Sequence, residues 1–163
     1  MSPEAIAELL AFLAQTPATI VSLVENLSEA DCRLKQTPEE FSVIENICHL
    51  RDIEAEGYAV RIKRILTEDQ PSLPDIDGAR LAVERNYNKQ NIDDALQSFA
   101  QARSQNLKSL GRLDSSELTR EGKLEGVGSV TLARLLMMMR DHDEGHIADI
   151  RSALRLPSAD SAD

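Results

Sequence analysis

Apolar residues recur every three or four positions along four long stretches of the chain, the spacing that places them on one face of an α-helix. Ser2-Pro3 begins the first stretch as an N-cap followed by proline at the first helical position. Thr16-Pro17 repeats this signal, so we expect the helix to be kinked or restarted near Gln15 before it ends at about Leu27. The apolar residues of this stretch include Ile6, Leu9, Leu10 and Leu13.

The second helix is predicted from a capping signal. Residues 28–41 are polar and contain Pro38, which indicates a connection. Ser42-Val43-Ile44-Glu45 then matches the S-x-x-E capping box, and the helix should end near Thr67 because Pro71 cannot continue it. Its apolar side carries Ile44, Ile47, Cys48, Tyr58, Ala59, Ile62, Ile65 and Leu66.

Two further long helices complete the pattern. Asn91, with Asp94 three residues later, starts one of them, after a short helix predicted over 80–87. The last helix is predicted to begin near Thr131 and to end about Arg155, before Pro157. The intervening segments 67–78 and 112–128 are long for loops in a compact domain, so we expect them to shape the entrance of a site.

Four helices of roughly 20 residues each favour an all-α fold, an antiparallel four-helix bundle with up-down-down-up or up-down-up-down order. The composition agrees, since 42% of residues are hydrophobic but only 3% are aromatic, which favours helices over strands. We expect one domain over residues 1–156 and a disordered acidic tail over 157–163.

Charge and cysteine usage exclude several classes of function. The 18 Lys+Arg against 28 Asp+Glu give a net charge of −10, which argues against nucleic-acid binding and against anionic membrane surfaces. Glu4 and Glu8 stand where a signal peptide needs positive charge, and the uncharged run 9–24 is too short and too polar to span a bilayer. Two cysteines without a disulfide pattern indicate a reducing, cytoplasmic location.

The chain has only three histidines, and their positions are the main functional signal. His142 and His146 are four residues apart in the last helix, so both imidazoles can reach one ion. His49 lies about two turns into the second helix. The inward face of the last helix is predicted to carry Leu132, Leu135, Leu136, Met139, His142, His146, Ile150 and Leu154.

Three imidazole ligands would leave an open coordination position, which is typical of catalytic metal sites. The alternative is that each histidine is a core residue that donates to a backbone carbonyl, or a surface residue without a functional role. The residues next to the histidines disfavour two other kinds of metal site. A zincin motif has glutamate directly after its first histidine, whereas Asp143 follows His142 here. Di-iron bundles need a glutamate three residues before the histidine, whereas Glu45 precedes His49 by four. Cys48 points about 100° away from His49 and is interpreted as a core residue.

Two segments resemble motifs of the DinB/YfiT-like superfamily of four-helix bundles, which includes bacterial metal-dependent thiol transferases. The segment from Phe41 to Asp52 is similar to W-S-x-x-E-x-x-x-H-L-x-D, with Phe41 in place of the usual tryptophan, and Arg140 to Ile147 is similar to H-x-x-x-H-I/L. The stretches 67–71 and 130–132 are also similar to members of that family. The resemblance implies that His49, His142 and His146 bind Zn²⁺ or Ni²⁺, that the protein forms a homodimer, and that a low-molecular-weight thiol (glutathione, mycothiol or bacillithiol) is a co-substrate.

These observations together predict a metal-dependent transferase that activates a small thiol, or water, toward an electrophilic substrate. Glu45 could orient the His49 imidazole, and Asp52 and Glu56 are weaker candidates for that task or for proton transfer. Asp141 and Asp143 are expected to face solvent. The alternative function is a non-catalytic bundle that binds a metal or a small ligand in a stress response.

Overall fold

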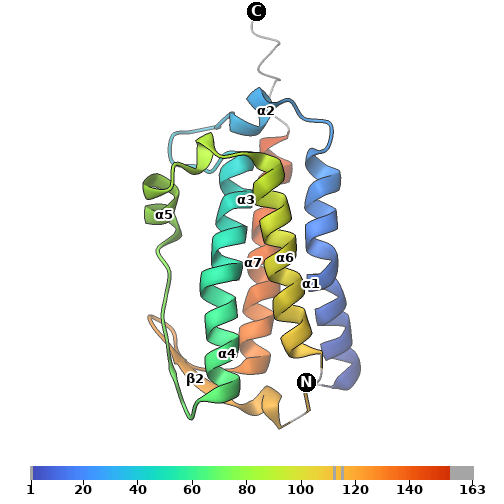
Figure 1. The fold of residues 1–163 in the computed structure, drawn as a ribbon, viewed down its shortest axis with the longest axis vertical. Coiled ribbons are helices and arrows are strands. Elements are labelled where there is room, and N and C mark those ends of the chain that lie inside the picture. The colour runs from blue at the N-terminus through green and yellow to red at the C-terminus, as the bar shows by residue number, and fades with distance from the viewer. Residues whose placement is uncertain (1, 112, 115, 155–163) are drawn as a thin grey trace, which may run out of the picture.

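The computed structural model describes residues 2–111, 113–114 and 116–154. Four long helical segments lie side by side (Figure 1) and confirm the predicted four-helix bundle. The four segments are α1 (Pro3–Val24), α3 (Val43–Asp52) continued by the π-helix η1 (Ile53–Tyr58) and α4 (Ala59–Thr67), α6 (Ile92–Leu110), and α7 (Leu132–Ala153). The predicted tail over 157–163 and the predicted helix end at Arg155 lie outside the described residues.

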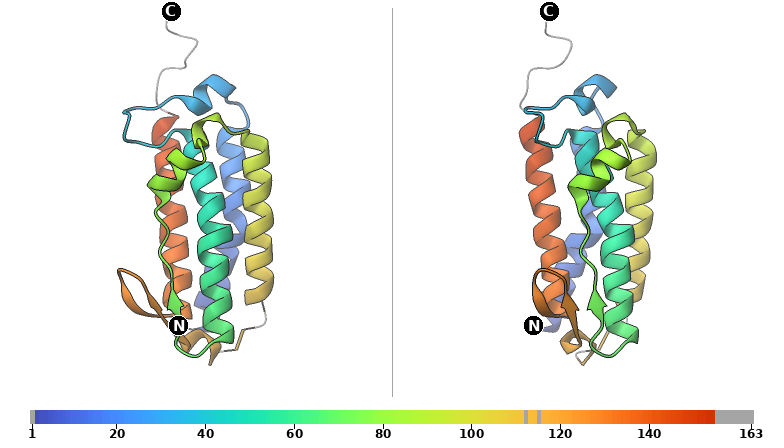
Figure 2. Two further views of the ribbon diagram at one scale, coloured as in Figure 1. Left: turned by 60° about the vertical axis from the view of Figure 1, so that its left-hand side comes forward. Right: turned by 90° about the vertical axis from the view of Figure 1, so that its left-hand side faces the viewer.

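The helices run up-down-down-up in chain order (Figure 1). Helices α1 and α7 run in one direction, and the α3–α4 segment and α6 run in the other. Because α3 and α6 are parallel neighbours, the chain must return along the whole bundle between them. Residues 68–91 make this crossover on the outside of the bundle (Figure 2).

The crossover contains a strand and two short helices. Strand β1 (Ser72–Leu73) is followed by α5 (Gly78–Glu84) and the 3₁₀-helix η2 (Tyr87–Lys89). The short helix predicted over 80–87 thus begins earlier, because Asp77 caps it by accepting from the Arg80 N–H. Arg85 and the Tyr87 hydroxyl both bond to the Asp52 carboxylate, and these contacts fix the crossover against α3.

The segment 112–128 contains structure that its sequence pattern does not predict. A 3₁₀-helix η3 (Glu117–Thr119) precedes strands β2 (Glu121–Leu124) and β3 (Gly128–Thr131). The strand order is β1-β2-β3, with β1 parallel to β2 and β2 antiparallel to β3. The two long loops are therefore joined in one small sheet, and this pairing between distant segments has no local signature.

Most helix starts lie where their capping residues predict them. The Ser42–Glu45 capping box is complete, since each side chain accepts from the other residue's backbone N–H. Asn91 and Thr131 cap α6 and α7. In the connection predicted over 28–41, Ser28 caps a short helix, α2 (Glu29–Arg33), which the prediction does not include.

Helix α1 is continuous through Pro17, so the predicted restart near Gln15 is wrong. Proline has no N–H to donate to the Leu13 carbonyl one turn earlier. Instead, Arg103 Nη1 on α6 donates to that carbonyl at 2.8 Å. Helix α1 is long and apolar enough, with a mean hydropathy of 1.5, to cross a membrane by length and composition alone, and core helices of globular proteins have the same composition. In the bundle it buries Leu13 and Ile20 completely.

Asp143 is completely buried, and its predicted exposure to solvent is therefore wrong. The inward face of α7 continues from Met139 through Asp143 and Ile147 to Ile150, so the two histidines lie at its edge. The Asp143 carboxylate forms two hydrogen bonds with Arg103, which is also buried. A carboxylate can occupy this core position because a charged partner from α6 compensates it.

Candidate metal centre

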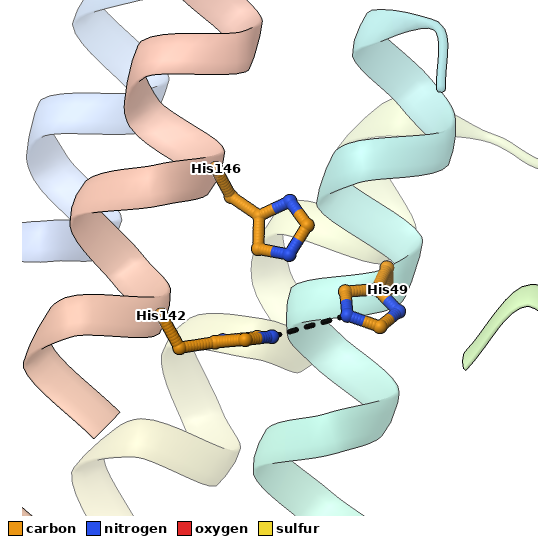
Figure 3. Close-up of side chains that lie close together, drawn as sticks. All are labelled: His49, His142 and His146. Atoms are coloured by element: carbon orange, nitrogen blue, oxygen red, sulfur yellow. Dashed lines mark hydrogen bonds between the residues drawn. The ribbon is translucent and has the colours of Figure 1, made fainter. Parts of the chain in front are cut away.

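The three histidines of the chain lie together between α3 and α7 (Figure 3). His49 comes from α3, and His142 and His146 come from successive turns of α7. One ring nitrogen from each residue lies within 4.8 Å of the other two, and the ring centroids are 4.5 to 5.2 Å apart. The convergence expected from their spacing is present in the structure.

The geometry fits two ligands of a single ion. His49 Nε2 and His142 Nε2 are 3.1 Å apart. Two nitrogens that bind one tetrahedral zinc at about 2.0–2.1 Å are separated by about 3.3 Å. Two lone pairs at such a distance repel each other unless a proton or a cation lies between them.

Burial keeps all three imidazoles neutral at pH 7, the form that binds metals. It lowers the pKa of His49 to about 4, that of His142 to about 3 and that of His146 to about 4. Repulsion from His146 lowers the first two further. The Nδ1 atoms of His49 and His142 are buried and have no hydrogen-bond partner among the described residues.

Asn46 orients His146, a role that the sequence analysis missed. Its Oδ1 lies 2.7 Å from His146 Nδ1, and its Nδ2 donates to the carbonyls of Phe41 and Ser42 at the start of α3. Because these carbonyls fix which end of the amide is the acceptor, Nδ1 of His146 is the protonated nitrogen and Nε2 is free. The available signal was an amide one turn before His49 on the same helix.

Gly78 packs directly on the His49 ring. A Cβ atom at this position would lie 2.2 Å from His49 Cε1 and 2.5 Å from Nδ1. Gly78, the last residue of the 67–78 segment, therefore contacts the site, and the role of this segment in shaping an entrance stays a prediction. The contact joins residues 29 positions apart and could not be predicted from local pattern.

The two carboxylates predicted to assist the site have other contacts. Glu45 accepts from the Ser42 N–H at 2.8 Å and pairs with Lys35 at 3.1 Å. Asp52 accepts from Arg51, Arg85 and Tyr87. Burial opposes ionisation of Asp52, but these bonds hold its pKa below the ordinary value.

The other acidic residues considered from the sequence, Glu56 and Asp141, form ion pairs with arginines. Glu56 pairs with Arg85, and Asp141 is exposed as predicted and pairs with Arg140. The carboxylate nearest to a site histidine in these contacts is that of Asp149, whose Oδ2 is 3.9 Å from His146 Nδ1.

A cavity of about 360 Å³ is lined by two residues that contact the site histidines, although the histidines themselves are not part of its lining. Phe41 and Asn46 line it, and each also contacts a site histidine: the rings of Phe41 and His49 are 5.5 Å apart, and Asn46 binds His146. Ala79 and Asp149 also line it. Its volume is in the range of small-molecule pockets.

Comparison with known proteins supports the fold and identifies the family. YfiT from Bacillus subtilis, described as a probable metal-dependent hydrolase with an unusual four-helix bundle topology, superposes with a TM-score of 0.88. The match has 20% sequence identity and covers 95% of this chain and 89% of YfiT, so it shows a shared fold. No curated protein sequence matches the chain. A sequence profile of the DinB superfamily matches residues 12–150, and the chain therefore belongs to the DinB superfamily.

Proposed function

We propose that the protein is a metal-dependent enzyme in which His49, His142 and His146 bind one divalent cation, Zn²⁺ or Ni²⁺. The observation that carries this proposal is the convergence of three neutral imidazoles whose ring nitrogens lie within 4.8 Å of one another. Three protein ligands leave a position open for a further ligand. The description of YfiT as a probable metal-dependent hydrolase is consistent with this proposal.

A divalent cation with an open position lowers the pKa of a water or thiol bound there and so supplies a nucleophile at neutral pH. Residues around the three histidines hold their rings in the orientation that metal binding needs. Asn46 holds the His146 proton on Nδ1, and the Gly78 backbone restricts the His49 ring. We propose that an electrophilic substrate binds in the cavity lined by Phe41 and Asn46, because each of these residues contacts a site histidine.

Metal content tests the site. Protein purified without a histidine tag should contain about one metal ion per chain after growth in zinc- or nickel-supplemented medium. Inductively coupled plasma mass spectrometry measures this metal content. His146→Ala should lose the metal, whereas Glu144→Ala, at an exposed position of the same helix, should keep it. A wild-type protein without metal under these conditions would contradict the proposal.

The nature of the nucleophile needs a separate measurement. We propose a low-molecular-weight thiol with an electrophile as second substrate, and water as the alternative nucleophile. Glutathione, mycothiol and bacillithiol are each assayed with chlorodinitrobenzene, and an activated ester is assayed without thiol. A chelator-sensitive rate with a thiol indicates a transferase, and one with the ester alone indicates a hydrolase. Bound metal without turnover in either assay would favour the non-catalytic binding protein.

A further inference from the structure

Arg61 and Tyr58 are two buried polar side chains beside the candidate metal centre. Both lie on the helical segment of His49, where η1 continues into α4. The guanidinium carbon of Arg61 lies 5.6 Å from the centre of the Tyr58 ring. The Tyr58 ring in turn packs edge-on against His142, with ring centroids 6.0 Å apart. A single ring therefore separates the guanidinium from a proposed metal ligand.

Each of these side chains has a hydrogen-bond donor without a partner among the described residues. Tyr58 is 5% exposed, and its hydroxyl forms no hydrogen bond there. Arg61 donates through Nε to the Pro74 carbonyl at 3.0 Å and through Nη2 to Asp75 Oδ1 at 3.3 Å, whereas its Nη1 has no acceptor. Neither the hydroxyl nor Nη1 is fully enclosed by the protein, so both remain open to a bound molecule.

The free end of Arg61 lies in the space that Gly57 leaves. A Cβ atom at position 57 would lie 3.7 Å from Arg61 Nη1 and 3.3 Å from Ile76 Cδ1 of the crossover. His49, farther along the same helical segment, meets the crossover at Gly78. Arg61 and His49 thus face the same segment of the chain, with Gly57 between them in sequence.

The carboxylate partner of Arg61 is exposed. Arg61 itself is 6% exposed, whereas the side chain of Asp75 is 67% exposed, so water screens its charge. The buried carboxylates of Glu54 and Asp143 pair with Arg103 instead. A guanidinium binds a carboxylate through parallel hydrogen bonds, and exclusion of water strengthens them. Arg61 is therefore suited to bind a carboxylate of a ligand.

We propose that Arg61 and Tyr58 bind a carboxylate of the thiol co-substrate. This inference rests on the proposed metal site, whose open position takes the sulfur of that thiol. Arg61 Nη1 and the Tyr58 hydroxyl donate to the carboxylate, and this second point of attachment fixes the orientation of the thiol. The two residues thereby determine specificity: they select thiols that carry a carboxylate, such as glutathione and bacillithiol, over mycothiol, which has none.

Binding of small thiols to the cobalt-loaded protein tests this inference. Co²⁺ replaces Zn²⁺ at imidazole sites and gives a near-ultraviolet absorption band when a thiolate binds to it, so the titration measures binding without turnover. Mercaptoacetate, mercaptopropionate and mercaptohexanoate are each compared with the mercaptoalcohol of the same length. The wild type should bind at least one of the acids about tenfold more tightly than its alcohol, the effect of a charge-assisted hydrogen bond.

Three variants identify the source of this preference. Arg61→Gln should show a preference about tenfold smaller than that of the wild type. Tyr58→Phe keeps the ring against His142 and removes one neutral donor, so its preference should be about threefold smaller. Asp75→Asn is the matched control: it breaks the ion pair of Arg61 from the other side and frees Nη2, so it should keep or raise the preference.

The outcomes separate the two proposals. A wild type that binds no cobalt contradicts the metal site, and the inference is overturned with it. If the wild type binds cobalt and thiols without preferring the acids, or if Arg61→Gln keeps the full preference, the metal site stands and this inference is overturned. Equal losses in Arg61→Gln and Asp75→Asn would also overturn it, because the ion pair with the crossover would then be the cause.

A folding control covers the case in which Arg61→Gln is unfolded, which helical circular dichroism detects. Tyr58→Phe and Asp75→Asn then decide the test. The inference requires a smaller preference for the acids in Tyr58→Phe and a retained one in Asp75→Asn. An unchanged preference in Tyr58→Phe would overturn it.

Discussion

The side chain of Asn46 accepts a hydrogen bond from His146 across the α3–α7 interface, with 2.7 Å between Oδ1 and Nδ1. Asn46 is completely buried, and the carbonyls of Phe41 and Ser42 fix its orientation. The capping region of α3 thereby determines which nitrogen of a histidine on α7 is free to bind an ion.

Asn46→Ala should weaken zinc binding about 10- to 100-fold, the range observed when a hydrogen-bond partner of a metal-ligating histidine is removed. Asn46→Asp keeps an acceptor for the Nδ1 proton, but its second oxygen would face the Phe41 and Ser42 carbonyls without a donor, so it should recover only part of the affinity. Isothermal titration with zinc measures both variants. Unchanged binding in Asn46→Ala would show that His146 needs no orienting partner.

Gly78→Ala should displace the His49 ring, because the added Cβ would lie 2.2 Å from Cε1. We expect weaker metal binding with retained helical circular dichroism. Gly145→Ala is the matched control: its Cβ would meet nothing within 4 Å, and it lies in α7 beside His146. Alanine favours the helix by about 0.5–1 kcal/mol, so this control should be slightly stabilised and bind metal normally. Equal metal affinity in Gly78→Ala and Gly145→Ala would contradict the close packing of Gly78 against the His49 ring.

Arg103→Leu should lower the free energy of unfolding of the metal-free protein by about 3–5 kcal/mol, because the buried carboxylates of Glu54 and Asp143 lose their charged partner. Arg64→Leu breaks a surface pair with Glu68 and should cost less than about 1 kcal/mol. Urea unfolding followed by circular dichroism gives both values. A similar decrease in the free energy of unfolding in the two variants would be inconsistent with buried ion pairs between Arg103 and the carboxylates of Glu54 and Asp143.

The metal-free protein should lose stability as the pH falls below about 6.5. An unfolded histidine takes up a proton near pH 6.5, whereas the folded pKa is about 4 for His49 and His146 and about 3 for His142. The unfolded chain thus binds more protons between these values, and the stabilisation present above pH 6.5 is lost as the pH falls toward 4.

Urea unfolding in a chelator at pH 7.5 and pH 5.0 measures this effect. The wild type should lose more stability between the two values than His146→Ala, which has one fewer buried imidazole. An equal change in both proteins would show that His146 does not have a depressed pKa.

Local signals predicted much of the fold. The capping residues Ser42, Asn91 and Thr131 identify three helix starts, and the spacing of His142 and His146 predicts that both reach one site. Contacts between distant segments could not be predicted in this way. Pro17 indicates a helix break, but Arg103, 86 residues later, satisfies the carbonyl that proline leaves without a donor.

The same reason explains the error at Asp143. Its charge indicates a surface position, and only the approach of Arg103 makes burial favourable. The contacts of Asn46 and Gly78 with the histidines likewise depend on how α3, α5 and α7 meet.

Zinc K-edge X-ray absorption of the zinc-loaded protein tests the central claim most directly, because it reports the ligands of the ion itself. The account predicts about one zinc per chain, with three imidazole nitrogens at about 2.0–2.1 Å and one further light ligand. His146→Ala should lose one imidazole from this set or fail to bind. A spectrum of the wild type with fewer than three imidazoles, or one unchanged by His146→Ala, would contradict the proposed site.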